Sequence, residues 1–253
     1  MGIAAARESA SVDLELLEPE FRSDVSVELV RASAADSDVV WAARVSTVGE
    51  ASLAAVHEDP ERSGGLIRYL MRSRHGTPFE HNSFTFLVRA PIFVFREFMR
   101  HRTFSYNEES ARYRELAPVF YVPGSDRQLV QEGKPGHYRF VPGTAEQHEL
   151  VSVATMEACR TAYAAYRRML EAGVAREVAR GVLPVATYSS MYATCNARAL
   201  MSFLSLRTAR PDSTFPSYPQ REIEMVAEQM EGHFARLMPI TYDAFNGAGR
   251  VSP

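Results

Sequence analysis

The sequence predicts a globular fold that mixes helices and strands. With 253 residues, 46% of them hydrophobic, the chain can bury a sizeable core. Phe84, Phe86 and Val88 alternate with other residues over 83–89, which is the period-two pattern of a strand. Residues 144–172 instead form a long helical segment that ends at Gly173, a residue type common just after helices. The chain is therefore expected to contain both kinds of element.

The chain before residue 90 is expected to contain two strands and two helices. The second helix is expected to bury Leu66, Tyr69 and Leu70. It stops where Gly76 and Pro78 together prevent its continuation. In order, these elements are a strand over 25–30, a helix over 34–43 that contains Trp41 and that Arg44-Val45-Ser46 ends, a helix over about 60–74, and the strand over 83–89.

A third helix opens the central segment, residues 91–115, in which arginines are concentrated between apolar residues. Proline is tolerated at the first helical position because its missing N–H has no partner there, so Pro91 marks the start. Ile92, Phe95 and Met99 follow at helical spacing and are expected to form one apolar face. This helix leads directly into three cationic or titratable residues, Arg100, His101 and Arg102.

A second helix of the central segment is expected to start at Ser105, which stands three residues before Glu108 as in a capping box. Glu108 and Arg112 then share a helix face. Residues 100–102 would link two packed helices and hold a small anion, because guanidinium groups grip phosphate or carboxylate in two-point contact. The alternative is a solvated, salt-bridged face. The apolar flanks favour a buried link, where charge needs a ligand or a partner.

The second half of the sequence is punctuated by proline and glycine at its start and is mainly helical afterwards. Residues 1–24 are expected to be a loosely held arm, flexible at the N-terminus, and 25–253 a single catalytic domain. The later elements are a loop-rich stretch over 116–143 with one hairpin, the helix over 144–172, a short helix over 174–180, a strand over 185–193, a helix that Asn196 caps and that runs to about 208, and a last helix over 220–237.

The charge balance excludes a general attraction to nucleic acid. The chain carries 28 basic and 31 acidic residues, a net charge of −3, so any basic site must be local. Two cysteines, Cys159 and Cys195, predict no disulfide framework, and no apolar signal core follows a basic start. The longest uncharged run, 181–197, is too short and too polar to span a bilayer. We expect a cytoplasmic protein with no membrane role.

Two further pairs of arginines are candidates for anion binding. Arg176 and Arg180 stand four residues apart and share a helix face. Arg198 and Arg207 stand nine apart, which at 100° per residue places them half a turn out of phase. This geometry predicts different partners for Arg198 and Arg207, and fits two anionic ligands better than one. For each arginine alone, exposure to solvent is the alternative.

Metal and thiol chemistry receive little support from the sequence. His75, Glu80 and His81 supply possible ligands, but their spacing matches no His-Glu-x-x-His site and no cysteine pair lies nearby. Cys195 has no general base among its neighbours, so we expect a buried structural thiol and not a nucleophile. No Rossmann glycine motif follows a strand, and no Walker loop is present.

Arg100-His101-Arg102 followed, after seven residues, by Ser110 resembles the Arg-His-Arg-x7-Ser signature of the flavin-dependent thymidylate synthase family. The resemblance spans about 25–245. Other segments that resemble the family are Ala43-Arg44-Val45-Ser46, His75-x-Thr77-Pro78-Phe79-Glu80-His81, Ala179-Arg180-x-Val182-Leu183-Pro184, and Asn196-Ala197-Arg198 with Arg207.

The resemblance implies an α+β fold, an antiparallel sheet packed by helices, in a homotetramer whose active sites are shared between chains. It also implies reductive methylation at C5 of a uracil nucleotide, dUMP to dTMP. Methylenetetrahydrofolate would donate the carbon and NADPH would reduce FAD, which passes on the hydride without a cysteine nucleophile. Nucleic acid, membrane and metal are not among the implied partners.

The resemblance assigns individual residues to the two ligands. Arg207 and Arg100 take catalytic roles, since Arg207 would polarise the pyrimidine as C5 becomes nucleophilic. The nucleotide-binding positions are Glu97, Arg100, Glu108, Ser110, Arg112, Arg180 and Arg207. The flavin-binding positions are Ser46, His75, Thr77, Glu80, His101, Arg102, Asn196, Arg198 and Ser202.

Two departures from the family pattern leave the substrate open. Ser202 stands where an amide or imidazole side chain is expected, which weakens one hydrogen bond to the flavin. Residues 208–211 stand where a histidine often follows Arg207. Relatives in nucleoside-antibiotic pathways resemble the chain and methylate UMP, so UMP, or both nucleotides, is the alternative to dUMP. The remote alternatives are a single-stranded nucleic-acid binding module and a metal hydrolase built on His75 and His81.

Overall fold

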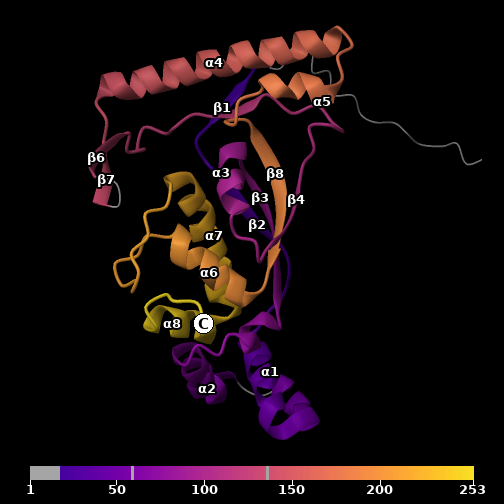
Figure 1. Ribbon diagram of the computed structural model, residues 1–253, viewed down its shortest axis with the longest axis vertical. Helices are drawn as coiled ribbons and strands as arrows, with labels where there is room; N and C mark the ends of the chain where they lie inside the picture. The colour runs from indigo at the N-terminus through magenta and orange to yellow at the C-terminus, as the bar shows by residue number, and fades with distance from the viewer. Residues whose placement is uncertain (1–17, 58–59, 135–136) are drawn as a thin grey trace, which may run out of the picture. The chain divides into compact units, whose positions relative to one another are not determined.

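The computed structural model describes residues 18–57, 60–134 and 137–253 (Figure 1). These residues form two compact units. The sheet unit comprises residues 24–113 and 188–253, and the α4 unit comprises residues 18–23 and 114–187. The predicted division into an arm over 1–24 and one catalytic domain over 25–253 stays a prediction.

A four-stranded antiparallel sheet organises the described residues of the sheet unit. The strand order is β2-β3-β8-β4, with β2 at Ser26–Ser33, β3 at Ser83–Pro91, β8 at Tyr188–Cys195 and β4 at Ser105–Glu108. The strands predicted over 25–30, 83–89 and 185–193 are confirmed, although β8 begins three residues later than expected. The mixed α+β class and its antiparallel sheet are confirmed as well.

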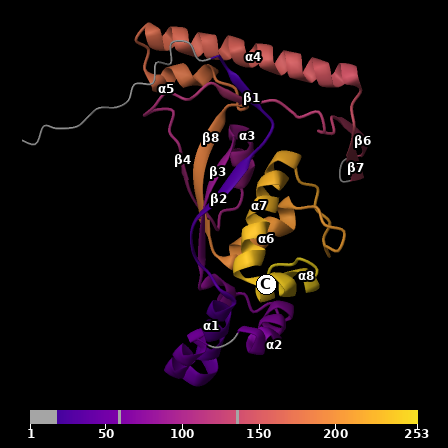
Figure 2. The ribbon, with the colours of Figure 1, turned by 180° about the vertical axis from the view of Figure 1, so that it is seen from behind.

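Helices α6 and α7 cover one face of this sheet, as both views show (Figure 1, Figure 2). Alternate residues of β3 point into the core there, and the Phe84 ring meets Phe234 of α7 edge-on with centroids 6.2 Å apart. The helices of the sheet unit are α1 (Asp36–Val48), α2 (Pro60–Arg72), α3 (Ile92–Phe98), α6 (Ala197–Arg207), α7 (Arg221–Leu237) and α8 (Pro239–Gly247), with 3-10 turns η2 (Gly49–His57) and η3 (Thr77–Glu80).

The predicted inward faces of two helices are partly wrong. Tyr69 of α2 is 52% exposed, and Ile67 is buried in its place. Met99 is 44% exposed, because α3 ends at Phe98 and turns Val94 and Phe98 inward. In both helices the sheet and its neighbours select a face that several apolar residues allow, and spacing alone does not distinguish those choices.

The second helix predicted in the central segment is also wrong. Ser105–Glu108 forms the edge strand β4, with Ser105 opposite Thr194 and Glu108 opposite Met191 of β8. The Ser-x-x-Glu pattern is a local preference, and pairing with β8 satisfies the same backbone groups. Residues 100–102 therefore connect a helix to a strand and not two packed helices.

Two helix ends differ from expectation. Arg44-Val45-Ser46 does not end α1, which continues to Val48 and stops at Gly49, where φ is +59°. Glycine adopts this left-handed conformation without steric cost. Helix α7 confirms the helix predicted over 220–237, but it is not the last one. Pro239 starts α8, which the sequence analysis did not predict.

The α4 unit is built around the 27-residue helix α4 (Ala145–Glu171). A reciprocal capping box between Thr144 and Gln147 starts this helix, and Gly173, with φ of +80°, follows its end. Tyr166 and Phe120 are fully buried in this unit's own core. Its other elements are a parallel pair of β1 (Glu20–Arg22) with β5 (Val119–Tyr121), the hairpin of β6 (Val130–Lys134) with β7 (His137–Val141), α5 (Arg176–Ala179) and η4 (Arg180–Val182).

These elements confirm the long helix, the single hairpin and the short helical segment predicted after it. Most of the predicted arm over 1–24 lies outside the described residues, and its described end contributes β1 to the α4 unit.

Within the described residues no helix is long and apolar enough to cross a membrane. A cytoplasmic location stays a prediction.

Candidate active site

Arg207, the last residue of α6, lies against Glu97 of α3 and His101 in the link after it. The Arg207 Nη1 donates to Glu97 Oε2 at 2.7 Å, and its Nε donates to His101 Nε2 at 3.0 Å. Its Nη2 lies 3.5 Å from the Glu97 carbonyl oxygen, at the limit for a hydrogen bond. The Arg207 and Glu97 side chains are 19% and 27% exposed. The pair is thus partly screened from water and still reachable by a ligand.

Burial sets the protonation of this cluster. Burial, together with the smaller effect of the Arg207 charge, lowers the pKa of His101 to about 4. The imidazole is therefore neutral near pH 7, accepts at Nε2, and carries its proton on Nδ1. Burial also raises the pKa of Glu97, with Glu222 adding to the rise and Arg207 opposing it. Glu222 is a neighbour that the sequence analysis did not identify.

Aromatic residues support the link over 100–102 through hydrogen bonds and ring stacking. The Tyr106 hydroxyl of β4 lies 2.7 Å from the Phe98 carbonyl oxygen and 2.9 Å from that of His101. Burial raises the pKa of Tyr106, so its hydroxyl stays protonated and remains a donor. The rings of Phe98 and Phe203 stack with centroids 4.6 Å apart. These contacts fix the backbone of the link while its arginines project outward.

Arg100 and Arg102 are exposed, and within the described residues neither side chain has a hydrogen bond or an ion pair. Two unpaired guanidinium groups thus flank the half-buried cluster of Glu97, His101 and Arg207. Unpaired cations beside a partly desolvated arginine favour binding of an anion. The prediction that residues 100–102 form a buried link is confirmed for His101 only, because the side chains of Arg100 and Arg102 are exposed.

A second group gathers around Arg198 at the start of α6. The Arg198 Nη1 pairs with Glu80 Oε1 at 2.5 Å, and Nε donates to the Pro253 carbonyl oxygen at 2.7 Å. Asn82 Oδ1 accepts from the backbone N–H of Ala197, which docks the η3 segment onto the helix start. The Nη2 of Arg198 has no hydrogen-bond partner among the described residues. This group contains Glu80, Arg198 and Asn196, the last of which caps α6 as predicted.

Gly76 makes room for the Arg198 side chain. A Cβ added at Gly76 would lie 2.5 Å from both Cζ and Nε of Arg198, closer than such atoms approach each other. From the sequence, Gly76 is expected only at the end of a helix. Its second role depends on a contact across more than 120 positions, which no local pattern reveals.

The two groups lie at opposite ends of α6, which separates Arg198 from Arg207 by about 13 Å along the helix axis. Their partners differ, as the nine-residue spacing predicts. The resemblance assigns His101 to the flavin, but in the structure its Nε2 accepts a hydrogen bond from Arg207 of the other group.

The hydrogen bonds described above do not involve the remaining predicted residues. Ser46 lies exposed within α1 and its hydroxyl donates to the Ala43 carbonyl oxygen. The Arg112 guanidinium lies over the Tyr113 ring at 5.8 Å from its centroid. The others are His75, Thr77 and Ser202, which are exposed, Glu108 and Ser110, which are half-buried in and after β4, and Arg180, which is exposed in the α4 unit.

The predicted burial of the Cys195 thiol is confirmed. Cys195 is a free cysteine, 5% exposed, and burial raises its pKa well above the ordinary value. A thiol in this environment stays protonated and is a poor nucleophile. Across residues 18–57, 60–134 and 137–253, no group of three or more His, Cys, Asp or Glu side chains is arranged to hold a metal ion.

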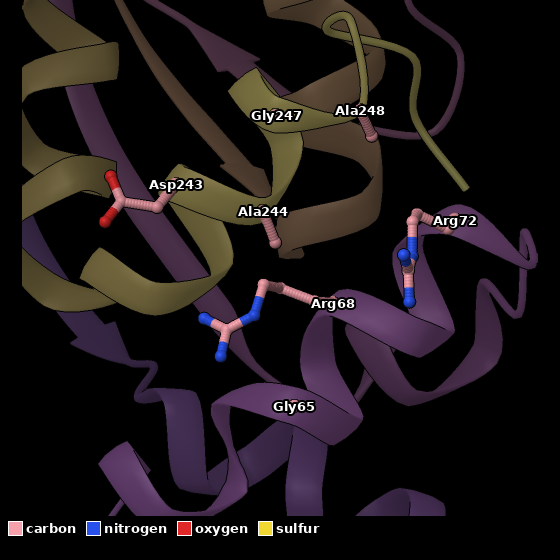
Figure 3. Close-up of a pocket in the computed structure, with 7 residues that line it drawn as sticks. All are labelled: Gly65, Arg68, Arg72, Asp243, Ala244, Gly247 and Ala248. Atoms are coloured by element: carbon pink, nitrogen blue, oxygen red, sulfur yellow. The ribbon is translucent and has the colours of Figure 1, made fainter.

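A cavity of about 330 Å³ lies between α2 and α8, and none of the predicted site residues lines it (Figure 3). Arg68 and Arg72, one helical turn apart on α2, project along it, and Asp243 lies on the α8 side. Small residues form the rest of its lining, namely Gly65, Ala244, Gly247 and Ala248.

Comparisons with known proteins cover most of the chain. Residues 28–240 match the family Thy1, thymidylate synthase complementing protein. The chain is 68% identical over 238 residues to the flavin-dependent thymidylate synthase of Streptomyces avermitilis, covering 94% of this chain and 97% of that protein. It is 56% identical over 239 residues to the flavin-dependent thymidylate synthase of Tropheryma whipplei strain TW08/27, covering 94% and 99%.

Two solved structures of the UMP/dUMP methylase PolB from Streptomyces cacaoi are also similar. The structure bound with 5-Br UMP has 61% identity and a TM-score of 0.85, and covers 93% of this chain and 99% of that one. The structure bound with 5-Br dUMP has 62% identity and a TM-score of 0.87, and covers 92% and 100%. The chain is therefore an enzyme of α+β structure. It belongs to the thymidylate synthase complementing protein family, which confirms the predicted relationship.

Proposed function

We propose that this enzyme methylates C5 of a uracil nucleotide, with dUMP as its substrate and dTMP as its product. The observation that carries the proposal is Arg207 held by Glu97 and neutral His101, beside the unpaired Arg100 and Arg102. The names of relatives with 68% and 56% identity support the same reaction.

Arg207 is the group that activates the pyrimidine in this proposal. Its Nε and Nη1 are occupied by His101 and Glu97, so the weakly bound Nη2 is the donor that turns toward a ligand carbonyl. A fixed cation there stabilises negative charge on the pyrimidine oxygens as C5 becomes nucleophilic. Arg100 binds the phosphate, and the other predicted nucleotide contacts are Glu108, Ser110, Arg112 and Arg180.

FAD fits the second group of residues. The unpartnered Nη2 of Arg198 can donate to a pyrophosphate oxygen, and Gly76 leaves space for the guanidinium. Bound FAD, reduced by NADPH, would supply a hydride. The proposed flavin-binding residues are Ser46, His75, Thr77, Glu80, Arg102, Asn196, Arg198 and Ser202, with His101 between the two ligands.

The reaction balances without a nucleophile from the protein. Methylenetetrahydrofolate would provide the carbon and leave as tetrahydrofolate, the hydride would convert the transferred methylene to a methyl group, and the C5 hydrogen would leave as a proton. Cys195 is buried and protonated, which agrees with a reaction that does not attack the pyrimidine through a thiolate. The role of the chain's own residues is to bind, orient and polarise.

UMP is the second candidate substrate, and the similarity to PolB favours it. PolB is a UMP/dUMP methylase and its structures hold 5-Br UMP and 5-Br dUMP. Competition between dUMP and UMP for methyl transfer, with the folate and NADPH present, distinguishes the candidates. Preferential formation of dTMP supports the first, and equal or greater methylation of UMP supports the second.

The proposed assembly is a homotetramer with shared active sites. Large apolar side chains are exposed on the α4 unit, among them Leu150 at 67% and Val178 at 64%. Apolar residues in such numbers on a surface favour association between subunits. The mass of the protein in solution tests this, with four chains expected and a monomer contradicting it.

Two crossed variants test the assignment of ligands. Arg207→Ala is expected to abolish nucleotide binding and leave FAD bound, since Arg207 lies in the nucleotide group. Arg198→Ala is expected to weaken the binding of FAD. Molecules of this variant that do hold FAD are expected to bind the nucleotide with the affinity of the original protein. Equal loss of both ligands in each variant, or a protein that takes up no FAD, would refute the proposal.

Steeply salt-dependent oligonucleotide binding would instead favour a nucleic-acid binding module.

A further inference from the structure

Arg250 and Glu231 form a buried ion pair directly behind the end of α6. Their side chains are 4% and 6% exposed, and Arg250 Nη1 lies 2.7 Å from Glu231 Oε1. The Tyr242 hydroxyl and Arg210 Nη2 also donate to Glu231, at 3.1 and 3.0 Å. Burying two charges is costly unless the geometry is well satisfied, and here Glu231 accepts from three donors.

The same guanidinium reaches the residue that follows Arg207. Arg250 Nη2 donates to Thr208 Oγ1 at 2.8 Å, and Thr208 is fully buried. The Thr208 hydroxyl donates to the Leu204 carbonyl oxygen at 2.7 Å, and the Thr208 carbonyl oxygen accepts from the Ser217 hydroxyl at 2.7 Å. Every polar group of Thr208 therefore forms a hydrogen bond, including its N–H, which donates to the Leu204 carbonyl oxygen.

The segment beyond Thr208 is held by helix α7. The Ala209 N–H donates to Glu224 of α7, and Arg210 bonds to Glu231, about two helical turns further along α7. Arg207 thus projects from a helix end whose next three residues are each bonded to α7 or to Arg250. A shift of this anchor moves the Arg207 backbone relative to Glu97 and His101.

We propose that the buried Glu231–Arg250 pair, acting through Thr208, is a positioning device for Arg207 and hence for the nucleotide. The inference rests on the proposed function of Arg207. A pair that served stability alone would be replaceable, since well-packed apolar residues of similar volume often substitute for a buried ion pair without loss of stability. Its position behind Arg207, with Arg250 bonded directly to Thr208, points instead to a role in geometry, where a small misplacement lowers the rate strongly.

The double variant Glu231→Leu/Arg250→Met separates positioning from stability. It removes both charges together, so no uncompensated buried charge remains. We expect a thermal midpoint and an FAD affinity like those of the original protein. The Kd of dUMP, measured by titration of the FAD-loaded enzyme, is expected to rise about tenfold to a hundredfold, with a matching fall in kcat/KM. Glu132→Gln, which removes the exposed pair with Arg139, serves as the control with unchanged values.

Thr208 provides a second pair of variants if the double variant unfolds early. Thr208→Val keeps the shape and loses the hydroxyl, whereas Thr208→Ser keeps the hydroxyl and loses a methyl group. The inference expects weakened dUMP binding in the valine variant and near-original binding in the serine variant. Equal behaviour of the two variants would overturn it.

Arg207→Ala, measured alongside, distinguishes the two possible failures. If Arg207→Ala binds dUMP normally, the proposed function of Arg207 is wrong. If Arg207→Ala loses dUMP while Glu231→Leu/Arg250→Met and Thr208→Val retain original affinity and kcat/KM, the proposed function stands and the positioning role is refuted.

Discussion

The low pKa of His101 predicts a specific dependence of stability on pH, which His101→Gln should remove. Glutamine does not titrate, and its side-chain oxygen can accept from Arg207 in place of Nε2. His101 is 9% exposed, and its pKa is about 4 in the folded chain against an ordinary value of 6.5. At about 1.4 kcal/mol per pKa unit, this difference corresponds to about 3 kcal/mol of unfolding free energy.

The sign follows from which state binds the proton. Between pH 6.5 and about 4 the unfolded chain protonates this histidine and the folded chain does not. The free energy of unfolding therefore falls as the pH drops through that window. Above the window the histidine is neutral in both states, and the free energy of unfolding keeps its full value. Glu97 acts in the opposite direction, because its raised pKa lets the folded chain bind a proton first.

Urea unfolding at fixed protein concentration, from pH 7 down to pH 4, measures this effect. The other groups that face His101, including Glu97 and Arg207, are present in both proteins. The difference between the original protein and His101→Gln thus isolates the histidine. The original protein should lose about 3 kcal/mol more than the variant across the window. Parallel pH profiles would refute the buried, neutral state of His101.

Three other substitutions have distinct expected results. Gly76→Ala, at a φ of −75° that alanine tolerates, should displace the Arg198 guanidinium and raise the FAD Kd about tenfold with little loss of stability; an unchanged FAD titration contradicts the close approach. Tyr106→Phe should lower the unfolding free energy by about 1 to 3 kcal/mol, because two buried carbonyl oxygens lose their shared donor; denaturant titration checks this. Cys195→Ala should keep its kcat and lose about 1 kcal/mol of stability, whereas loss of turnover in a folded variant would identify a catalytic thiol.

Elements with strong local signals could be predicted from the sequence. Thr144 and Gln147 cap α4 reciprocally, and Asn196 caps α6, because these interactions involve residues three apart. The alternation of Phe84 and Phe86 identified the central strand β3 for the same reason. Such signals depend on neighbours in the sequence and not on the rest of the fold.

The failures occurred where distant contacts decide the outcome. Ser105 and Glu108 match a capping box, but pairing with β8 makes them a strand. Gly76 and Glu222 carry no local sign of their proximity to Arg198 and Glu97, which neighbouring elements bring together. The hydrogen bond between His101 and Arg207 likewise joins residues 106 positions apart, and the assignment of His101 to the flavin stays a prediction.

A structure of the enzyme with FAD and a uracil nucleotide both bound tests the central claim most directly. We predict the pyrimidine within hydrogen-bond distance of the Arg207 guanidinium and the FAD pyrophosphate against Arg198, at opposite ends of α6. Both ligands at one end of α6, or a nucleotide that leaves Arg207 untouched, would contradict the account.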